Sequence, residues 1–313
     1  MPYIYGPVLS RRLGLSLGVD PVPLKTCNLN CIYCQLGPTP SRKGMSPALP
    51  PVSIILDELS EALASAPEVD YVTVSGSGEP TLHEGLGSLI RAIRALTKIP
   101  IAVITNGTLL SSGDVREALC QADVVLPSLD AAENRAFKRI ARPYGWLVVE
   151  GVIAGLVAFR RQFRRQLWLE VMLICGLNDT PEQLDQLKAA LDTIKPDRIH
   201  LNTVVRPPAI EWVLPVAPDR MAEIATYLGP CCEVIADHPS KVPRVKGLAM
   251  ADMIVRAVKR RPMTLHDLAA SLGAMPAQVA ACVARLLVGG AIQSKLYQGR
   301  LYYLSHSAGE RDV

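Results

Sequence analysis

The chain has 313 residues, of which 49% are hydrophobic and 20% are charged, and its net charge is +4. This composition suits a folded protein with one large core and a smaller second one, and it excludes an intrinsically disordered chain. The sequence opens without a charged leader and apolar run, and no apolar stretch is long enough to span a bilayer, so we expect a cytoplasmic protein with no membrane partner.

Three of the eight cysteines, Cys27, Cys31 and Cys34, fall within the segment KTCNLNCIYCQLG at 25–37. Structural zinc and ferredoxin-type clusters both take four ligands, and no fourth ligand follows closely. Three unrelated buried cysteines remain an alternative, although thiols rarely gather this densely for packing. Three thiolates on one loop suit an iron–sulfur cube in which the fourth iron is left open to a small molecule.

From residue 71 to 205, short β-like runs rich in Val, Ile and Leu alternate with helical segments. This alternation predicts an α/β fold, a parallel sheet or barrel with helices outside. Reactive groups in such folds lie on loops at the carboxyl ends of the strands. The expected strands are 71–76, 99–106, 122–130, 167–174 and 198–205. The expected helices are 86–96, 112–121, 146–163 and 181–194, the last with Thr180 as N-cap.

Beyond a predicted linker at 237–247, the pattern changes to three helical segments and two β-like runs around Gln298 and Gly299, a plausible tight turn. This order is typical of a winged helix, a module that docks nucleic acid or protein. We therefore expect two domains, 1–240 and 248–306. From Lys241 onward 11 Lys and Arg face 4 Asp and Glu, which leaves 22 against 25 elsewhere. The basic end indicates either a polyanionic partner or a solvated surface.

The C-x3-C-x2-C spacing, with Tyr33 directly before the last cysteine, resembles the motif of the radical S-adenosylmethionine (SAM) superfamily. The resemblance implies a partial (β/α) barrel and a 4Fe-4S cluster held by Cys27, Cys31 and Cys34, with SAM chelated at the open iron. In that superfamily the reduced cluster cleaves SAM, and hydrogen is then abstracted from a substrate. Tyr33 would shield the cluster and offer its backbone to the adenine edge. A flavodoxin-like reductase is the implied electron donor.

The flanking sequence SRRLGLSLGVDPVPLKTCNLNCIYCQLG, residues 10–37, is similar to wyosine-synthesising tRNA enzymes, and that similarity covers most of residues 1–240. It implies a tRNA base as substrate. The archaeal and eukaryotic wyosine enzymes carry a second cysteine cluster, whereas the remaining cysteines here are scattered. A peptide, a protein or a small molecule is the alternative substrate. An iron–sulfur regulator that binds nucleic acid is the third hypothesis.

The segment SGSGEPTL at 75–82 resembles the glycine-glycine-glutamate-proline element of the superfamily, with Ser77 in place of one glycine. The match implies that Gly76, Gly78 and Glu79 contact the methionyl amino group of SAM. An ordinary strand-to-helix turn is the alternative.

Side chains at the later strand ends are implied to complete the SAM site. They are Thr105 and Asn106 for the ribose, Ser128 and Asp130 for the ribose or the methionyl carboxylate, and Ile174 and Asn178 for the adenine. Each polar residue among them has a local alternative, as a turn residue or a helix cap.

Two further features concern the substrate. Asn202 and Arg206 end the last expected strand and face the expected pocket, where Arg206 would clamp a carboxylate or phosphate or else cover the rim. Arg11 and Arg12 are expected before the first strand, on a solvated surface, or in contact with phosphates if the substrate is RNA.

Overall fold

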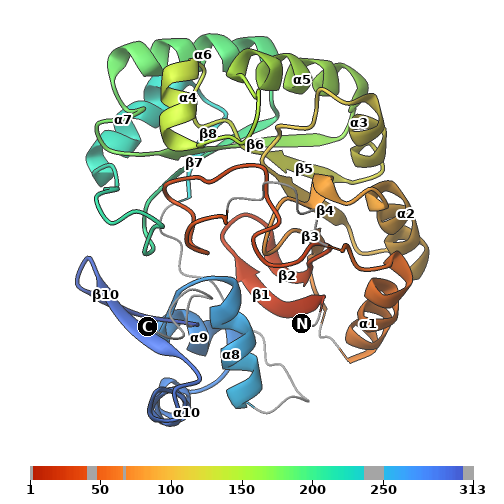
Figure 1. The fold of residues 1–313 in the computed structure, drawn as a ribbon, viewed down its shortest axis with the longest axis vertical. Helices are drawn as coiled ribbons and strands as arrows, with labels where there is room; N and C mark the ends of the chain where they lie inside the picture. The colour runs from red at the N-terminus through yellow and green to blue at the C-terminus, as the bar shows by residue number, and fades with distance from the viewer. Residues whose placement is uncertain (1–2, 41–47, 66–67, 236–249, 306–313) are drawn as a thin grey trace.

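The computed structural model describes residues 3–40, 48–65, 68–235 and 250–305. Eight strands form one sheet in chain order, with β1 antiparallel to β2 and with β2 to β8 all parallel (Figure 1). The strands are β1 (Ile4–Ser10), β2 (Gly14–Val19), β3 (Tyr71–Val74), β4 (Ile101–Thr105), β5 (Val124–Pro127), β6 (Gln166–Leu173), β7 (Arg198–Thr203) and β8 (Cys232–Val234). The predicted α/β fold, a partial barrel, is confirmed.

Helices cover the outer face of this sheet, as Figure 1 shows. Helix α6 has the predicted bounds because Thr180 caps it and Pro181 opens it. The barrel helices are α1 (Val52–Ser65), α2 (Leu86–Leu96), α3 (Gly113–Leu119), α4 (Asn134–Ile140), α5 (Val149–Gln162), α6 (Pro181–Ile194) and α7 (Pro218–Leu228).

The two faces of the sheet differ in chemistry, because successive side chains of a strand point to opposite sides. On β6, Leu169 and Val171 belong to the large core under the helices. Glu170, between them, points into the barrel and lines its cavity, as does Asn202 of β7. Deeper in the barrel, Trp168 packs in a small apolar cluster that also includes Leu13. The interior of the barrel therefore has a polar layer with an apolar cluster beside it.

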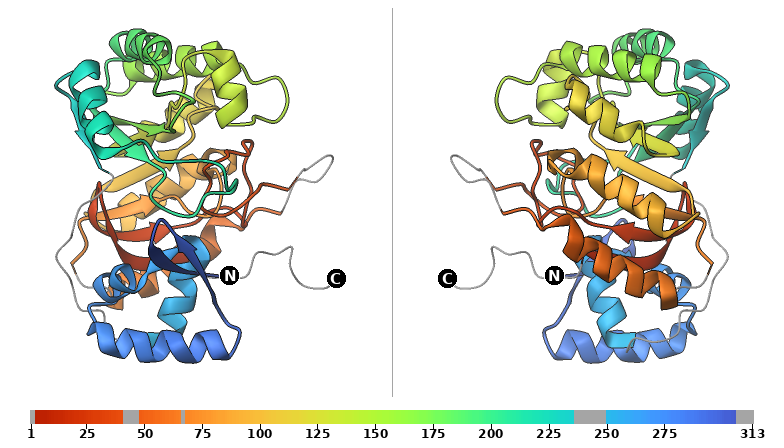
Figure 2. Two further views of the ribbon diagram at one scale, coloured as in Figure 1. Left: turned by 90° about the vertical axis from the view of Figure 1, so that its left-hand side faces the viewer. Right: turned by 90° about the vertical axis from the view of Figure 1, so that its right-hand side faces the viewer.

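The C-terminal residues form a separate hydrophobic cluster and pack beside β1, where Figure 2 shows them on one side of the barrel. Thr264 caps the second helix with a full capping box, and Gln298 and Gly299 both have positive φ, as a tight hairpin turn requires. The elements are α8 (Met250–Arg260), β9 (Met263–Thr264), α9 (Leu265–Leu272), α10 (Pro276–Val288), β10 (Gln293–Tyr297) and β11 (Arg300–Leu304). The helix–hairpin order agrees with the prediction, while the winged-helix class and the domain bounds stay predictions.

The structure departs from the sequence-based expectation in three places. Arg11 and Arg12 do not precede the first strand: they lie in the turn between β1 and β2, and both line the cavity. The strand that ends near Asn202 is not the last, because the three-residue β8 pairs with β7. Helices α1, α4 and α7 were not among the predicted helices, and α4, with seven residues, is too short for a clear periodic pattern. The predicted linker lies outside the described residues.

Among the described residues, no single helix is long and apolar enough to cross a membrane, and α9 with α10 reach that length only as a pair bent by 116°.

Candidate active site

The loop that carries the three cysteines lies at the carboxyl ends of the parallel strands. Backbone hydrogen bonds tie it on one side to the segment after β3 and on the other to the end of α4 and the segment that follows. The pairs, donor first, are Lys25–Ser77, Glu79–Thr26, Ile32–Ile140 and Tyr144–Asn28. The Ile32 side chain is fully buried between these attachments. These contacts fix the loop to the barrel on both sides.

All three thiols are free and partly exposed, and hydrogen-bond donors point at two of them. The Lys25 ammonium lies 3.2 Å from Cys34 Sγ, while the Asn106 amide nitrogen lies 3.7 Å from Cys27 Sγ. Burial, and then the Glu79 carboxylate, raise the pKa of the Cys27 thiol to about 11. The Cys27 thiol is therefore protonated until a cation replaces the proton.

This donor set fits the predicted cluster. Thiolates bound to iron keep excess negative charge, which the Lys25 ammonium and the Asn106 amide would offset. No three His, Cys, Asp or Glu side chains among the described residues meet closely enough to hold one metal ion. A cube of four irons does not need them to meet, because each cysteine binds a separate corner. Cys27, Cys31 and Cys34 would hold such a cluster.

The two glycines of the segment after β3 are required by close packing. A Cβ at Gly76, whose φ is +145°, would lie 2.3 Å from the Asp20 carboxyl carbon. A Cβ at Gly78 would lie 2.1 Å from the Thr26 carbonyl oxygen, directly beside Cys27. Any side chain here would push the segment away from the cysteine loop. Both glycines line the cavity, where the predicted contact with the methionyl group would be made.

Glu79 is fully engaged within the protein. Its carboxylate accepts hydrogen bonds from Thr81 N and Oγ1, from Thr105 Oγ1 and from Asn106 N, at 2.6 to 3.0 Å. Burial raises its pKa, and these hydrogen bonds oppose the rise. Glu79 thus joins the ends of β3 and β4, and it does not line the cavity. Contact of Glu79 with SAM stays a prediction.

Thr105 and Asn106 also hold local structure. Besides their bonds to Glu79, Asn106 Oδ1 accepts from Thr108 N and Oγ1, and its amide nitrogen donates to Asn28 at 2.8 Å. Neither residue lines the large cavity, although Asn106 borders a smaller one beside it. The structure places Asn106 against the cysteine loop, and the predicted contact with ribose stays untested.

Ser128, Asp130 and Tyr33 meet at the wall of the large cavity. Tyr33 donates from its hydroxyl to Asp130 Oδ2 at 2.5 Å, and Asp130 Oδ1 accepts from Met172 N at 2.9 Å. Burial raises the pKa of Asp130 to about 6, against the effect of these two bonds. Asp130 therefore fixes Tyr33, the residue before the last cysteine. It does not cap the following helix, because α4 is capped by Glu133.

The two residues predicted for adenine lie away from the large cavity. Ile174 is fully buried and packs with Ile32 of the cysteine loop. The Asn178 side chain accepts from Ile174 N and donates to the carbonyls of Asp130 and Met172. Both residues brace the end of β6, and contact with adenine stays a prediction.

A cavity of about 840 Å³ extends from the cysteine loop to helices α8 and α9. Of the residues predicted from the sequence, those that line it are Tyr33, Cys34, Gly76, Gly78, Ser128, Asp130, Asn202 and Arg206. Helix α8 and the residue that follows it supply part of the opposite wall, including Arg256, Arg260 and Arg261. The cavity thus connects the predicted cofactor site with a region that the sequence did not connect to it.

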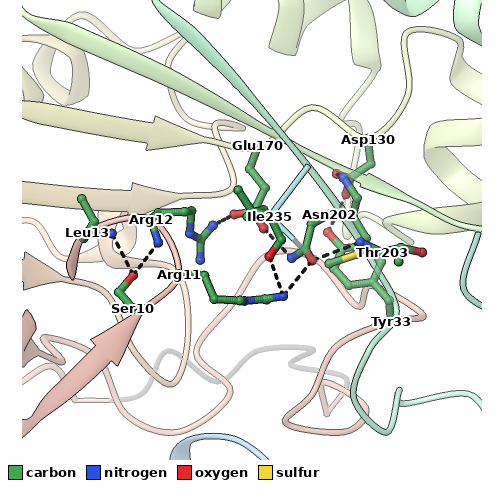
Figure 3. Close-up of polar contacts among 11 residues, drawn as sticks. Ser10, Arg11, Arg12, Leu13, Tyr33, Asp130, Glu170, Asn202, Thr203 and Ile235 are labelled. Atoms are coloured by element: carbon green, nitrogen blue, oxygen red, sulfur yellow. Dashed lines mark hydrogen bonds and ion pairs between the residues drawn. The ribbon is translucent and has the colours of Figure 1, made fainter. Parts of the chain in front are cut away.

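Charged side chains form a chain of contacts inside the barrel, shown in Figure 3. Arg12 forms an ion pair with Glu170, Glu170 accepts from Asn202 Nδ2 at 3.0 Å, and Asn202 Oδ1 accepts from Arg11 at 3.3 Å. Sequence reasoning missed Glu170 as a site residue, and it placed Arg11 and Arg12 on a solvated surface or against RNA phosphates instead of inside the barrel. One signal was available: Glu170 interrupts the apolar run LWLEVML, where a carboxylate needs a buried partner.

Comparison with known proteins agrees with this geometry. The family model of the radical SAM superfamily matches residues 22–200. A protein from Synechocystis named UPF0026 protein slr1464 is 38% identical over 212 residues, which is 67% of this chain and 78% of that protein. A Brachyspira hyodysenteriae protein named GTPase Obg is 38% identical over 96% of this chain, which spans 45% of that protein's length.

Among solved structures, Streptococcus suis SuiB bound to S-adenosylmethionine matches with a TM-score of 0.54 at 16% identity, over 71% of this chain and 50% of that one. This likeness shows the shared fold. The chain belongs to the radical SAM superfamily and is a radical SAM enzyme, and the cofactors of that superfamily are a 4Fe-4S cluster and SAM.

Proposed function

We propose that this enzyme abstracts hydrogen from a small molecule bound in the cavity between the barrel and the C-terminal domain. The supporting observation is that one cavity of about 840 Å³ is lined both by Cys34 and by helix α8. Pockets that enclose small ligands are of this size, and they gather a few polar groups on an otherwise apolar wall.

When bound to the reduced cluster, SAM supplies the hydrogen-abstracting radical chemistry. The protein chain positions the reacting groups and excludes water from the site. Gly76 and Gly78 let the backbone approach the cysteine loop, and the Tyr33–Asp130 hydrogen bond fixes one wall. The apolar cluster around Trp168 fills the barrel on the far side of the polar layer. A reactive species formed beside Cys34 would thus meet substrate in preference to solvent.

A tRNA base is the second candidate substrate. It is favoured by the basic balance from Lys241 onward, where 11 Lys and Arg face 4 Asp and Glu. A single nucleotide turned out of its stack would enter a cavity of this size. Filter binding with bulk tRNA at graded salt separates the candidates: a small-molecule enzyme shows no retention at low salt, and strong salt-sensitive retention favours tRNA.

Anaerobic reconstitution with iron and sulfide tests the reaction class. The wild-type protein is expected to take up about four irons per chain and to form 5′-deoxyadenosine from SAM after reduction. Cys34→Ala should do neither. The matched control, Cys175→Ala, replaces an exposed cysteine and should do both. A wild-type protein that holds no iron–sulfur cluster, or that leaves SAM intact after reduction, would overturn the proposal.

We also propose a flavodoxin-like electron donor and a cytoplasmic site of action, since all eight cysteines are free. Reduction by flavodoxin and its reductase, followed as 5′-deoxyadenosine formation, tests the donor.

A further inference from the structure

The cavity wall opposite the cofactor site carries an excess of arginine. The chain contributes these residues from three separate places: the β1–β2 turn, the loop after β7 and the end of α8. The arginines that line the cavity are Arg11, Arg12, Arg206, Arg256, Arg260 and Arg261, and the acidic residues are Glu58, Glu61, Asp130 and Glu170.

Several of these charges are satisfied by partners within the protein. Glu170 pairs with Arg12, Asp130 accepts from Tyr33 and Met172, and Glu58 accepts from the backbone of Tyr3 and Ile4. The Arg260 guanidinium pairs with Asp20 at the end of β2. Of these acidic groups, Glu170 and Asp20 are therefore each paired with an arginine other than Arg206 and Arg261.

Two arginines keep their hydrogen-bond donors unused. Within the described part of the chain, the side chains of Arg206 and Arg261 form no hydrogen bond and no ion pair, although both are partly buried. Arg12 Nε is buried without a partner among the same residues. The guanidinium of Arg11 donates to Asn202 Oδ1 and to the Ile235 carbonyl.

These four residues, Arg11, Arg12, Arg206 and Arg261, are close enough to destabilise each other's charge, and we call them the arginine cluster. Burial, followed by Arg261 and Arg11, lowers the pKa of Arg206. Burial, followed by Arg11 and Arg261, lowers the pKa of Arg12 to about 9. The Asp267 carboxylate, which also accepts from Thr264 N in the capping box of α9, opposes this for Arg206, and on Arg261 its effect is larger than that of Arg11.

A group of like charges with unused donors is stabilised by an anion, because planar guanidinium groups bind carboxylate and phosphate oxygens in pairs. We propose that the arginine cluster is an oxyanion subsite, in which Arg206 and Arg261 bind a phosphate or carboxylate group of the substrate. The inference rests on the proposed function and deepens it: the substrate is a small anion, anchored by its charged group at the arginine cluster while the rest extends towards Tyr33 and Cys34.

The subsite spans the two parts of the chain, since Arg206 follows β7 and Arg261 follows α8. Tyr302 of β11 donates to the Val205 carbonyl at 2.7 Å, next to Arg206. The C-terminal domain is thus held beside the strand end that carries Arg206. Its role in this proposal is to supply one arginine of the substrate site.

Binding of probe anions tests the subsite without any turnover. Isothermal titration of the reconstituted protein with inorganic phosphate, and separately with succinate, measures affinity and shows which oxyanion is preferred. Arg206→Gln and Arg261→Gln should each lower the affinity for the preferred probe by about tenfold or more, since each removes charge-assisted hydrogen bonds. Arg261→Lys keeps the charge but loses the planar guanidinium group, so its affinity for the probe should lie between those of the wild type and of Arg261→Gln. The matched control is Arg285→Gln, at an exposed position of α10, which should bind the probe with the affinity of the wild type.

Thermal unfolding separates this role from a purely structural one. The preferred probe should raise the Tm of the wild type and of Arg285→Gln, and it should not raise that of Arg206→Gln. Equal affinity of all variants, or no affinity of the wild type for either probe, would overturn the subsite. Failure of the proposed function looks different: SAM stays intact after reduction, while Cys34→Ala still binds the probe anion.

Discussion

Arg260, in the last turn of α8, forms an ion pair with Asp20 at the end of β2 and so joins that helix to the candidate site. The same guanidinium donates to Ser77 Oγ at 3.1 Å and lies 4.5 Å from the centre of the Tyr5 ring. Asp20 in turn accepts from Ser77 N and Oγ, beside the glycines that approach the cysteine loop. One buried pair therefore links the position of α8 to the cofactor side of the cavity.

Arg260→Gln should destabilise the protein by about 3 kcal/mol, because it leaves the buried Asp20 carboxylate without its counter-charge. Urea unfolding measures the loss. Lys259→Gln, at the exposed neighbouring position, should change stability by less than about 0.5 kcal/mol. If the two variants unfold at the same urea concentration, the pair does not stabilise the fold.

Asp20→Asn tests whether the two residues act together. In a double-mutant cycle with Arg260→Gln, the loss in the double variant should be smaller than the sum of the two single losses, because the second substitution removes an interaction that is already broken. Strict additivity would show that Arg260 acts through Tyr5 and Ser77 instead.

Lys25→Met should make the reduction potential of the cluster more negative. The ammonium lies 3.2 Å from Cys34 Sγ and also donates to the Gly37 carbonyl at 2.5 Å. A positive charge beside a cluster ligand favours the reduced state, which carries one more electron. Its removal should shift the potential by roughly 60 mV, the equivalent of one charge-assisted hydrogen bond in a one-electron couple.

Redox titration followed by electron paramagnetic resonance measures this shift. Lys25→Arg keeps the charge and should stay near the wild-type potential. Both substitutions place a non-glycine residue at the same φ of +60°, so backbone strain is common to them. A wild-type potential in Lys25→Met would show that the ammonium only braces the loop.

Elements bordered by strong local signals could be predicted from the sequence. Thr180 and Pro181 mark the start of α6, and Gln298 with Gly299 marks the hairpin turn, because these signals act within a few residues. The strand ends that carry Gly76 and Ser128 were predicted too, since the carboxyl ends of parallel strands meet at one edge.

The sequence could not show which side chains at those ends face the cavity. The partners of Asn178 are the backbone groups of Asp130, Met172 and Ile174, and no local pattern encodes them. Nor could it show that Arg260 meets Ser77, 183 positions away. Contacts of this kind depend on how the C-terminal domain packs on β1, and periodicity carries no information about that packing.

Glu79→Gln should destabilise the protein by about 2 kcal/mol. An amide has one carbonyl oxygen, and its NH2 group would face donors that now bond to a carboxylate, so at least one buried donor loses its partner. Urea unfolding of the cluster-free protein measures the effect on the fold, and SAM binding to the reconstituted protein measures the effect on the cofactor.

The two measurements on Glu79→Gln distinguish its roles. A residue that only joins β3 to β4 changes stability and leaves the affinity for SAM within a few-fold of wild type. A loss of SAM affinity well beyond that would support the predicted contact. Glu84→Gln, an exposed position on the same segment, serves as the control and should change neither.

His200 should make the fold sensitive to acid. It lies inside the barrel, where its ring meets Trp168 edge-on at 5.5 Å and its Nδ1 has no partner among the described residues. Burial, followed by Arg12 and Arg198, lowers its pKa from 6.5 to about 4. Between pH 4 and pH 6.5, therefore, this histidine binds a proton in the unfolded chain but not in the folded chain. Stability is complete above pH 6.5 and falls as the pH drops towards 4, by up to about 3 kcal/mol.

Urea unfolding of the cluster-free protein at pH 7.5, 5.5 and 4.5 measures this loss. His200→Gln should be less acid-sensitive than the wild type, because glutamine has no proton to bind on unfolding. Carboxylates contribute equally to both proteins, so the difference between the two curves isolates His200. His266→Gln, at an exposed position on α9, should follow the wild-type curve. Parallel losses in wild type and His200→Gln would mean that solvent reaches the ring inside the barrel and that its protonation does not oppose folding.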